Sequence, residues 1–457
     1  MTAEQLFLAG LSAYQRGERE AAARYCERAL SRGTLADALT VRLGHLYLVT
    51  TELWWQGDTS PEHVGAMVEE TARAAKRTGN PALEALADCA YGRYLIASAS
   101  LRHAVDVFTR ASALAKESGN LLAQLESLAD LGHHGVGLDM NRGRAVLREA
   151  HALARSAVSA PPADLPLVRV QRARIPGLIG VAAYDAGQFD EAERFLRESV
   201  GELTSVHAWD QHAIFVNFLA QLLTETGRFE EAESVLLSAL EPLQAHADLT
   251  TFQGYNLGLL GKCYLEWGRI DAAAEAVSAG WDRLSLTRHR SILPILRNYL
   301  GELVMHPANP HRDIPRARAL FDETIAECER TGFQRSEIGA LSLRAQADLA
   351  DGRLPEALAA SERAVTRLAA TGTLPALRSE EVYLTRFTVL SRAGAETEAA
   401  TWLARAVATL QAKAASLPSP ELQARFLSGT PASRQIVSAS MSQRDSTEIA
   451  GQRARQA

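Results

Sequence analysis

The sequence predicts an all-α protein, a right-handed superhelical solenoid of about ten helical hairpins. Three matched segments predict this fold: residues 187–193, 227–233 and 268–274 each contain a glycine, a polar, an apolar and an acidic residue, followed by an alanine-led helix. Gly187 and Gly227 are 40 residues apart, and Gly227 and Gly268 are 41 apart. A fixed period between about 20 and 50 residues is typical of stacked-repeat proteins.

Each position of the shared segment has a physical role. The glycine lets one helix end in a left-handed turn without a Cβ clash. The acidic residue lies at the start of the next helix, where unpaired backbone N–H groups favour negative charge. Small residues recur where the two helices are expected to cross: Gly180, Ala220 and Gly261 in the first helix, and Ala192, Ala232 and Ala273 in the second.

This order of small residue, glycine, alanine, large apolar residue and small residue resembles the tetratricopeptide repeat family. The family pattern has about 34 residues per repeat, whereas this chain has about 40–42. The chain therefore looks like the long-repeat variant, which is common in the sensor regions of bacterial signalling ATPases and transcription activators and in peptide-pheromone receptors. The resemblance implies the fold of most of the chain, but a fold does not fix a function.

The same register extends outward and predicts the domain organisation. We expect about four repeats in residues 1–158, a proline-rich break or hinge at 159–166, and about six repeats in 167–415. A capping helix is expected at 416–439, where it would cover the last apolar face. Residues 440–457 are polar without an apolar pattern, which predicts a disordered tail.

Composition narrows the class of protein. The chain has 457 residues, of which 47% are hydrophobic and 22% charged, and its net charge of −6 gives no general basic surface for nucleic acid. No segment has the length and apolarity of a membrane span, and the start lacks a secretion signal. Four widely spaced cysteines lie within helical patterns and are expected to be buried in a reducing cytoplasm: Cys26, Cys89, Cys263 and Cys328.

The sequence contains none of the motifs of the common enzyme classes. It has no phosphate-binding loop, no nucleotide fingerprint, no nucleophile elbow and no zinc-protease motif. Its histidines lack the spacing of a metal site; His133 and His134, for example, are adjacent and must face different directions on a helix. We therefore predict no enzymatic activity, no cofactor and no metal.

The candidate binding site is the concave groove, which the first helix of each hairpin lines in this fold. Residues three before and one after the small crossing residue are expected to face the groove, with the sixth before it near the rim. These positions are mostly amides, hydroxyls and cations: His45, Arg93, His133, Arg174, Asn217, Gln221, Tyr255, Lys262, Asn298, Glu302, Ser342 and Gln346. Amides can pair with the backbone of an extended peptide, and cations can bind carboxylates. An ordinary solvated helix face would also be polar, and this alternative stays open.

These observations predict a non-catalytic scaffold that binds a protein or peptide in its groove and acts in bacterial cytoplasmic regulation or signalling. One alternative is a regulator of the peptide-pheromone receptor type, in which the groove closes on a short peptide. A second is a transcriptional regulator linked to nucleic acid through a partner, because neither a helix-turn-helix nor a basic groove predicts direct binding. The sequence leaves the ligand and the oligomeric state open.

Overall fold

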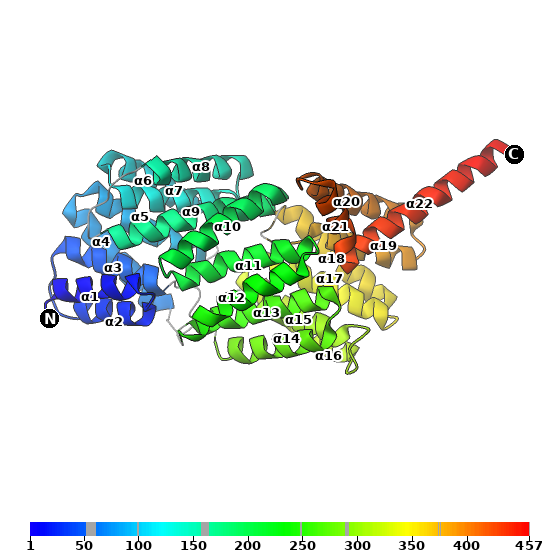
Figure 1. Ribbon diagram of the computed structural model, residues 1–457, viewed down its shortest axis with the longest axis horizontal. Helices are drawn as coiled ribbons and strands as arrows, with labels where there is room; N and C mark the ends of the chain where they lie inside the picture. Colours follow the sequence, from blue (N-terminus) through cyan, green and yellow to red (C-terminus); the bar gives the residue numbers. More distant parts are fainter. Residues whose placement is uncertain are drawn as a thin grey trace.

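The computed structural model describes residues 1–51, 61–97, 100–156, 164–246, 249–287, 292–372, 374 and 376–456. Within these ranges the regular structure consists of twenty-two helices, α1 to α22, and the described residues form no strand (Figure 1). Successive helices α1 to α20 pair as ten hairpins that stack side by side. The predicted all-α solenoid is therefore confirmed.

The first helices of successive hairpins pack on one another and form the inner layer. They are α1 (Ala3–Gln15), α3 (Asp37–Thr51), α5 (Pro81–Ala97), α7 (Leu121–Gly135), α9 (Leu165–Asp185), α11 (Trp209–Glu225), α13 (Thr250–Trp267), α15 (Leu293–Met305), α17 (Gln334–Ala350) and α19 (Ser379–Arg392). The second helices are α2 (Arg19–Leu30), α4 (Pro61–Thr78), α6 (Leu101–Ser118), α8 (Met140–Ser156), α10 (Phe189–Ser205), α12 (Phe229–Gln244), α14 (Ile270–Leu284), α16 (Ile314–Thr331), α18 (Leu354–Thr371) and α20 (Glu396–Ala415).

The small residues lie at the helix crossings, as the repeat pattern predicts. A Cβ atom added to Gly180 of α9 would come within 2.7 Å of Leu196 Cγ in α10, so only glycine fits there without movement. Ala232 of α12 has no exposed surface. The turn glycine Gly227 has a φ of +71°, a conformation that residues with a Cβ atom rarely adopt.

A second set of contacts joins consecutive first helices. A Cβ atom added to Gly177, three residues before the crossing residue of α9, would lie 2.5 Å from the ring of Phe215 in α11. Gly258 has the same position in α13, and a Cβ atom added to it would likewise lie too close to the side chain of Leu296 in α15. Phe215 and Leu296 both lie five residues before the crossing residue of their own helix. Positions three before the crossing therefore face the next first helix rather than an open groove.

Both ends of the chain return to its middle. Arg19 of α2 forms a buried ion pair with Asp210 in the first turn of α11. From the other end, Arg425 Nε donates a 3.1 Å hydrogen bond to the carbonyl oxygen of Gly227, in the turn between α11 and α12. Figure 1 shows the two ends on opposite sides of the central repeats, where α9 to α14 lie. These two contacts therefore tie the N-terminal and C-terminal helices to the central repeats.

The domain boundaries follow the helix order in part. The proline-rich break was expected at residues 159–166. Residues 157–163 lie outside the described residues, and α9 begins at Leu165. The division into two stacks therefore stays a prediction. After α20 the structure has two helices in place of one cap, α21 (Pro420–Gly429) and α22 (Pro431–Gln456), which bury Phe426 and Ile436 completely. Where we expected a disordered tail from residue 440, α22 continues as helix to Gln456.

The described residues include no helix that is long and apolar enough to cross a membrane. All four cysteines are buried free thiols, as the sequence predicts. Burial raises the pKa of the Cys26 thiol to about 12, which makes it unreactive at neutral pH.

Candidate functional site

The predicted basic residues of the N-terminal groove surround two fully buried carboxylates of α7. His45 Nε2 lies 2.9 Å from Glu126 Oε2, and Arg93 Nη2 lies 3.2 Å from the same oxygen. Arg93 Nε donates to Asp130 Oδ2 at 2.8 Å, and Arg174 Nη1 lies 3.6 Å from Asp130 Oδ1. Burial would raise the pKa of Glu126, but the charges of His45 and Arg93 outweigh it and hold the pKa at about 2. The chain therefore neutralises these cations with its own acids.

His133, also predicted to face the groove, is uncharged at neutral pH. Burial, together with the adjacent His134 and with Arg174, lowers its pKa to about 3. The His134 ring stacks on Phe108 with centroids 5.4 Å apart. His133 can therefore offer hydrogen bonds to a ligand but no charge.

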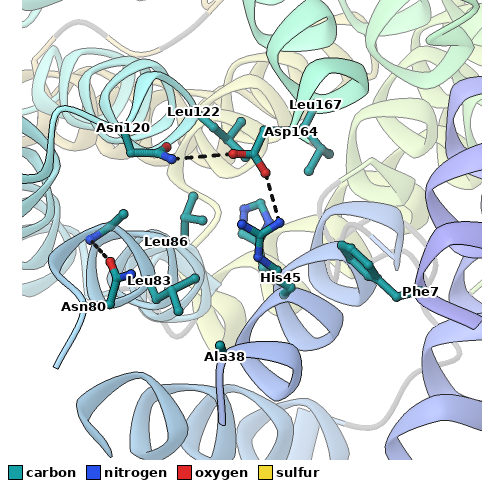
Figure 2. A pocket seen from close by; sticks show the side chains of 12 residues that line it. Phe7, Ala38, His45, Asn80, Leu83, Leu86, Asn120, Leu122, Asp164 and Leu167 are labelled. Carbon is teal, nitrogen blue, oxygen red and sulfur yellow. Dashed lines mark hydrogen bonds and ion pairs between the residues drawn. The ribbon is translucent and has the colours of Figure 1, made fainter. Parts of the chain in front are cut away.

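A small pocket of about 190 Å³ opens beside this network, at the N-terminal ends of α3, α5, α7 and α9 (Figure 2). Its apolar lining includes Leu83, Leu86 and Leu122, which Figure 2 shows around one cavity. At its edge, Asp164 accepts hydrogen bonds from Arg42 at 3.3 Å and from Asn120 at 3.5 Å. An apolar pocket with a few convergent polar groups is suited to one side chain of a ligand.

Further along the inner face, the predicted residues Lys262 and Glu302 pair with each other. Lys262 Nζ donates to Glu302 Oε1 at 2.6 Å and lies 2.9 Å from Glu266 Oε1. Arg378 Nη1, at the start of α19, donates to the same Glu266 oxygen at 3.0 Å. Burial would raise the pKa of Glu266, but Lys262 and Arg378 outweigh it and lower the pKa to about 2.

Three predicted groove residues are buried between first helices, which corrects the expected direction of their side chains. Asn217, Asn298 and Ser342 are 2%, 6% and 5% exposed. Asn298 Nδ2 donates to the carbonyl oxygen of Ser336 at 3.0 Å, and Ser342 Oγ donates to Thr385 Oγ1 at 3.0 Å. All three lie three residues before a crossing residue, where neighbouring helices meet.

Positions one after the crossing residue do reach the inner face. Gln346 is exposed and its Nε2 donates to Thr385 Oγ1 at 2.9 Å. Gln221 of α11 accepts a 3.0 Å hydrogen bond from Arg335 Nη2, although 114 residues separate the two. Arg335 lies at the start of α17, three hairpins further along, so the inner face is narrow enough for one side chain to cross it. Tyr255, near the rim in our prediction, is 8% exposed.

The sequence analysis did not identify three acidic residues that accept hydrogen bonds or form ion pairs along the inner face from α9 to α13. Asp185, Glu225 and Glu266 each lie five residues after the small crossing residue of α9, α11 and α13. Glu225 accepts hydrogen bonds from the Tyr184 hydroxyl and from Lys413 Nζ, both at 2.7 Å. The sequence does contain a signal for these residues, because an acidic residue recurs at the same position, five after the crossing residue, in three largely apolar helices.

Comparison with known proteins gives the class of this fold. No protein-family model matches the sequence, and no curated protein matches it. Among solved structures, it is similar to a Rap protein complexed with competence and sporulation factor, at 12% identity over 91% of this chain and 99% of that chain, with a TM-score of 0.55. It is also similar to the apo quorum sensor NprR from B. thuringiensis, at 14% identity over 80% and 98% with a TM-score of 0.51.

A third similar structure is aspartyl phosphate phosphatase F from Bacillus subtilis, at 10% identity over 80% of this chain and 93% of that chain, with a TM-score of 0.51. At such identities the likeness establishes the fold alone. The chain thus has the tetratricopeptide-like helical repeat architecture of these proteins.

Proposed function

We propose that this protein is a non-catalytic bacterial regulator that binds a peptide, or an extended segment of a protein, on the inner face of its superhelix. The observation that carries the proposal is the hydrogen bond between Gln221 of α11 and Arg335 of α17, which crosses the narrow inner face, with the mostly buried Tyr255 of α13 close enough to interact electrostatically with Arg335. Amide, hydroxyl and guanidinium groups together can bind both the donors and the acceptors of a peptide backbone.

The dimensions of the inner face fit an extended peptide. Packed helices lie about 10 Å apart, so three consecutive first helices span about 20–30 Å. An extended chain covers about 3.3 Å per residue, which corresponds to six to eight residues. The apolar pocket of Figure 2 lies on the same inner layer and could hold one apolar side chain of a longer ligand.

The similar structures support a regulatory role. One is a Rap protein complexed with competence and sporulation factor, and another is a quorum sensor. We extend this role to the present chain because the same fold presents a polar inner face here. A cytoplasmic location would follow from that role.

Two carboxylates of the inner face, Glu126 and Glu266, are unsuited to act as general bases. Glu126 and Glu266 are held in ion pairs, and their pKa values of about 2 make them poor proton acceptors at neutral pH. A general base works best when its pKa is near the working pH. These carboxylates therefore act as structural anchors for Arg93 and Lys262.

The test is affinity selection of a randomised hexapeptide mixture on the immobilised full-length chain, followed by binding measurements with the enriched peptides. We expect the dissociation constant to rise about fivefold or more in Gln221→Ala, because the replacement removes one amide from the inner face. Ser234→Ala, on the exposed side of α12, is the control. Peptides that bind both variants like the wild type, or no enriched peptide at all, would contradict the proposal. Enrichment of short free peptides would favour a receptor of the pheromone type.

A further inference from the structure

Arg335 of the inner face has no acidic partner within 4.0 Å among the residues that the structure describes. In the described part of the chain, each of the following has a carboxylate oxygen within 4.0 Å: Arg93, Arg174, Lys262, Arg378 and Lys413. No carboxylate in these residues comes that close to Arg335, whose one hydrogen bond goes to the neutral amide of Gln221. A guanidinium has five N–H donors, so most of them are unused here.

The surroundings of Arg335 keep its charge and add hydroxyl groups. Burial would lower the pKa of Arg335, but its surroundings, which include Asp185, raise the pKa overall, and the guanidinium stays protonated at neutral pH. Burial also raises the pKa of Tyr299, which keeps its hydroxyl as a donor. Neither the Tyr255 nor the Tyr299 hydroxyl hydrogen-bonds to any described residue.

Asp185, whose charge interacts with Arg335, has a hydrogen-bond partner of its own. Asp185 Oδ1 accepts a 2.9 Å hydrogen bond from the backbone N–H of Ala376, and its charge interacts with Arg335 only from beyond ion-pair distance. Arg335 is only partly buried, so water can reach the donors that the chain does not use. These donors are open to a carboxylate of a ligand.

We propose that Arg335 is the anion-binding residue of the inner face and takes a carboxylate group of the bound peptide. The inference rests on the proposed function and names the chemistry of its ligand. A planar guanidinium matches a carboxylate with two parallel hydrogen bonds. On binding, the carboxylate replaces Gln221 as the acceptor and leaves the Gln221 side-chain oxygen free to accept from the peptide backbone, while Gln221 Nε2 keeps its 3.1 Å hydrogen bond to the Asn217 carbonyl oxygen.

The carboxylate has two sources, the C-terminus of the peptide or an Asp or Glu side chain. The experiment therefore repeats the affinity selection on the full-length chain with two hexapeptide mixtures, one with free and one with amidated C-termini. We expect enrichment of an acidic residue at one fixed position, or enrichment from the free mixture alone. The selected peptide and its uncharged analogue, with Asn, Gln or a C-terminal amide in place of the acid, are then measured side by side.

Arg335→Gln is expected to weaken binding of the acidic peptide about tenfold or more and to change binding of the uncharged analogue less than twofold. Arg335→Lys keeps the charge and should retain the preference for the acid with weaker affinity. Arg330→Gln, on the exposed side of α16, is the charge-matched control and should alter neither. A melting curve of each variant checks that it is folded.

Two results would overturn the inference in distinguishable ways. Enriched peptides without an acidic preference, or with a preference that survives in Arg335→Gln, would show that Arg335 is no carboxylate site while peptide binding stands. The absence of any enriched peptide for the wild type would reject peptide binding itself, and the subsite with it.

Discussion

The ammonium group of Lys413 in α20 lies 2.7 Å from Glu225 Oε1 at the end of α11, although the two residues are 188 positions apart. Lys413 also donates to Glu380 of α19 at 2.7 Å. Burial would lower the pKa of Lys413, but the two carboxylates outweigh it and raise the pKa above its ordinary value. The ammonium group therefore stays charged and joins the last hairpin to the middle of the superhelix.

Replacing Lys413 with methionine should destabilise the protein by about 3–5 kcal/mol, because two buried carboxylates lose their shared cation. Chemical unfolding monitored by circular dichroism measures this effect. Lys76→Met, at an exposed position in the last turn of α4, is the matched control and should change the free energy of unfolding by less than about 0.5 kcal/mol. Equal effects of the two variants would show that the Lys413 contacts contribute nothing to stability.

Asp185 should make stability depend on pH. Burial raises its pKa from 3.8 to about 6 in the folded protein, more than the hydrogen bond from Ala376 lowers it. Protonation therefore favours the folded state. This contribution is fully present below about pH 4 and is lost as the pH rises through 6.

Asp185→Asn keeps an oxygen that can accept from Ala376 and removes the charge. Its free energy of unfolding, relative to wild type, should be higher at pH 7.5 than at pH 4.5. A pKa difference of about two units corresponds to roughly 3 kcal/mol. The gain in the free energy of unfolding should be smaller than this, because water reaches part of the Asp185 side chain. Urea unfolding at both pH values measures the gain, and a gain that is the same at both would show that Asp185 has an ordinary pKa.

Asn217→Ala should lower stability. The side chain is 2% exposed in α11, at a position that faces the next first helix. The side-chain oxygen of Asn217 has no hydrogen-bond partner among the described residues, so the expected loss of about 1–3 kcal/mol comes from the cavity that alanine leaves. Thermal unfolding measures the loss, with Gln346→Ala as the exposed inner-face control. An unchanged melting temperature for Asn217→Ala would place this residue in the open groove, as the sequence pattern first suggested.

Ala232→Leu should disturb one hairpin crossing. The position has no exposed surface, and overpacking of a filled core typically costs about 1–3 kcal/mol. Stacked repeats transmit such damage to their neighbours, so amide hydrogen exchange should speed up across residues 207–281. Ser234→Leu, exposed on the same helix, should leave exchange unchanged. Similar exchange in both variants would contradict the assigned crossing.

The sequence by itself determined the hairpins and their crossings. Local rules sufficed there: Gly227 needs a positive φ, and Gly180 and Ala232 lie where two adjacent helices touch. The same register also found Gln221 on the inner face. The register predicted the wrong direction for the Asn217 side chain. A repeat period of about 40 residues does not determine which side of a helix packs against the neighbouring repeat.

Only the tertiary structure decided which charges meet across the superhelix. The pairs Lys413–Glu225, Arg378–Glu266 and Arg335–Gln221 join residues more than 100 positions apart. Their contact depends on the small rotation that each repeat adds, summed over several hairpins. Side-chain packing at every interface sets that rotation, and no local pattern of residues encodes the sum.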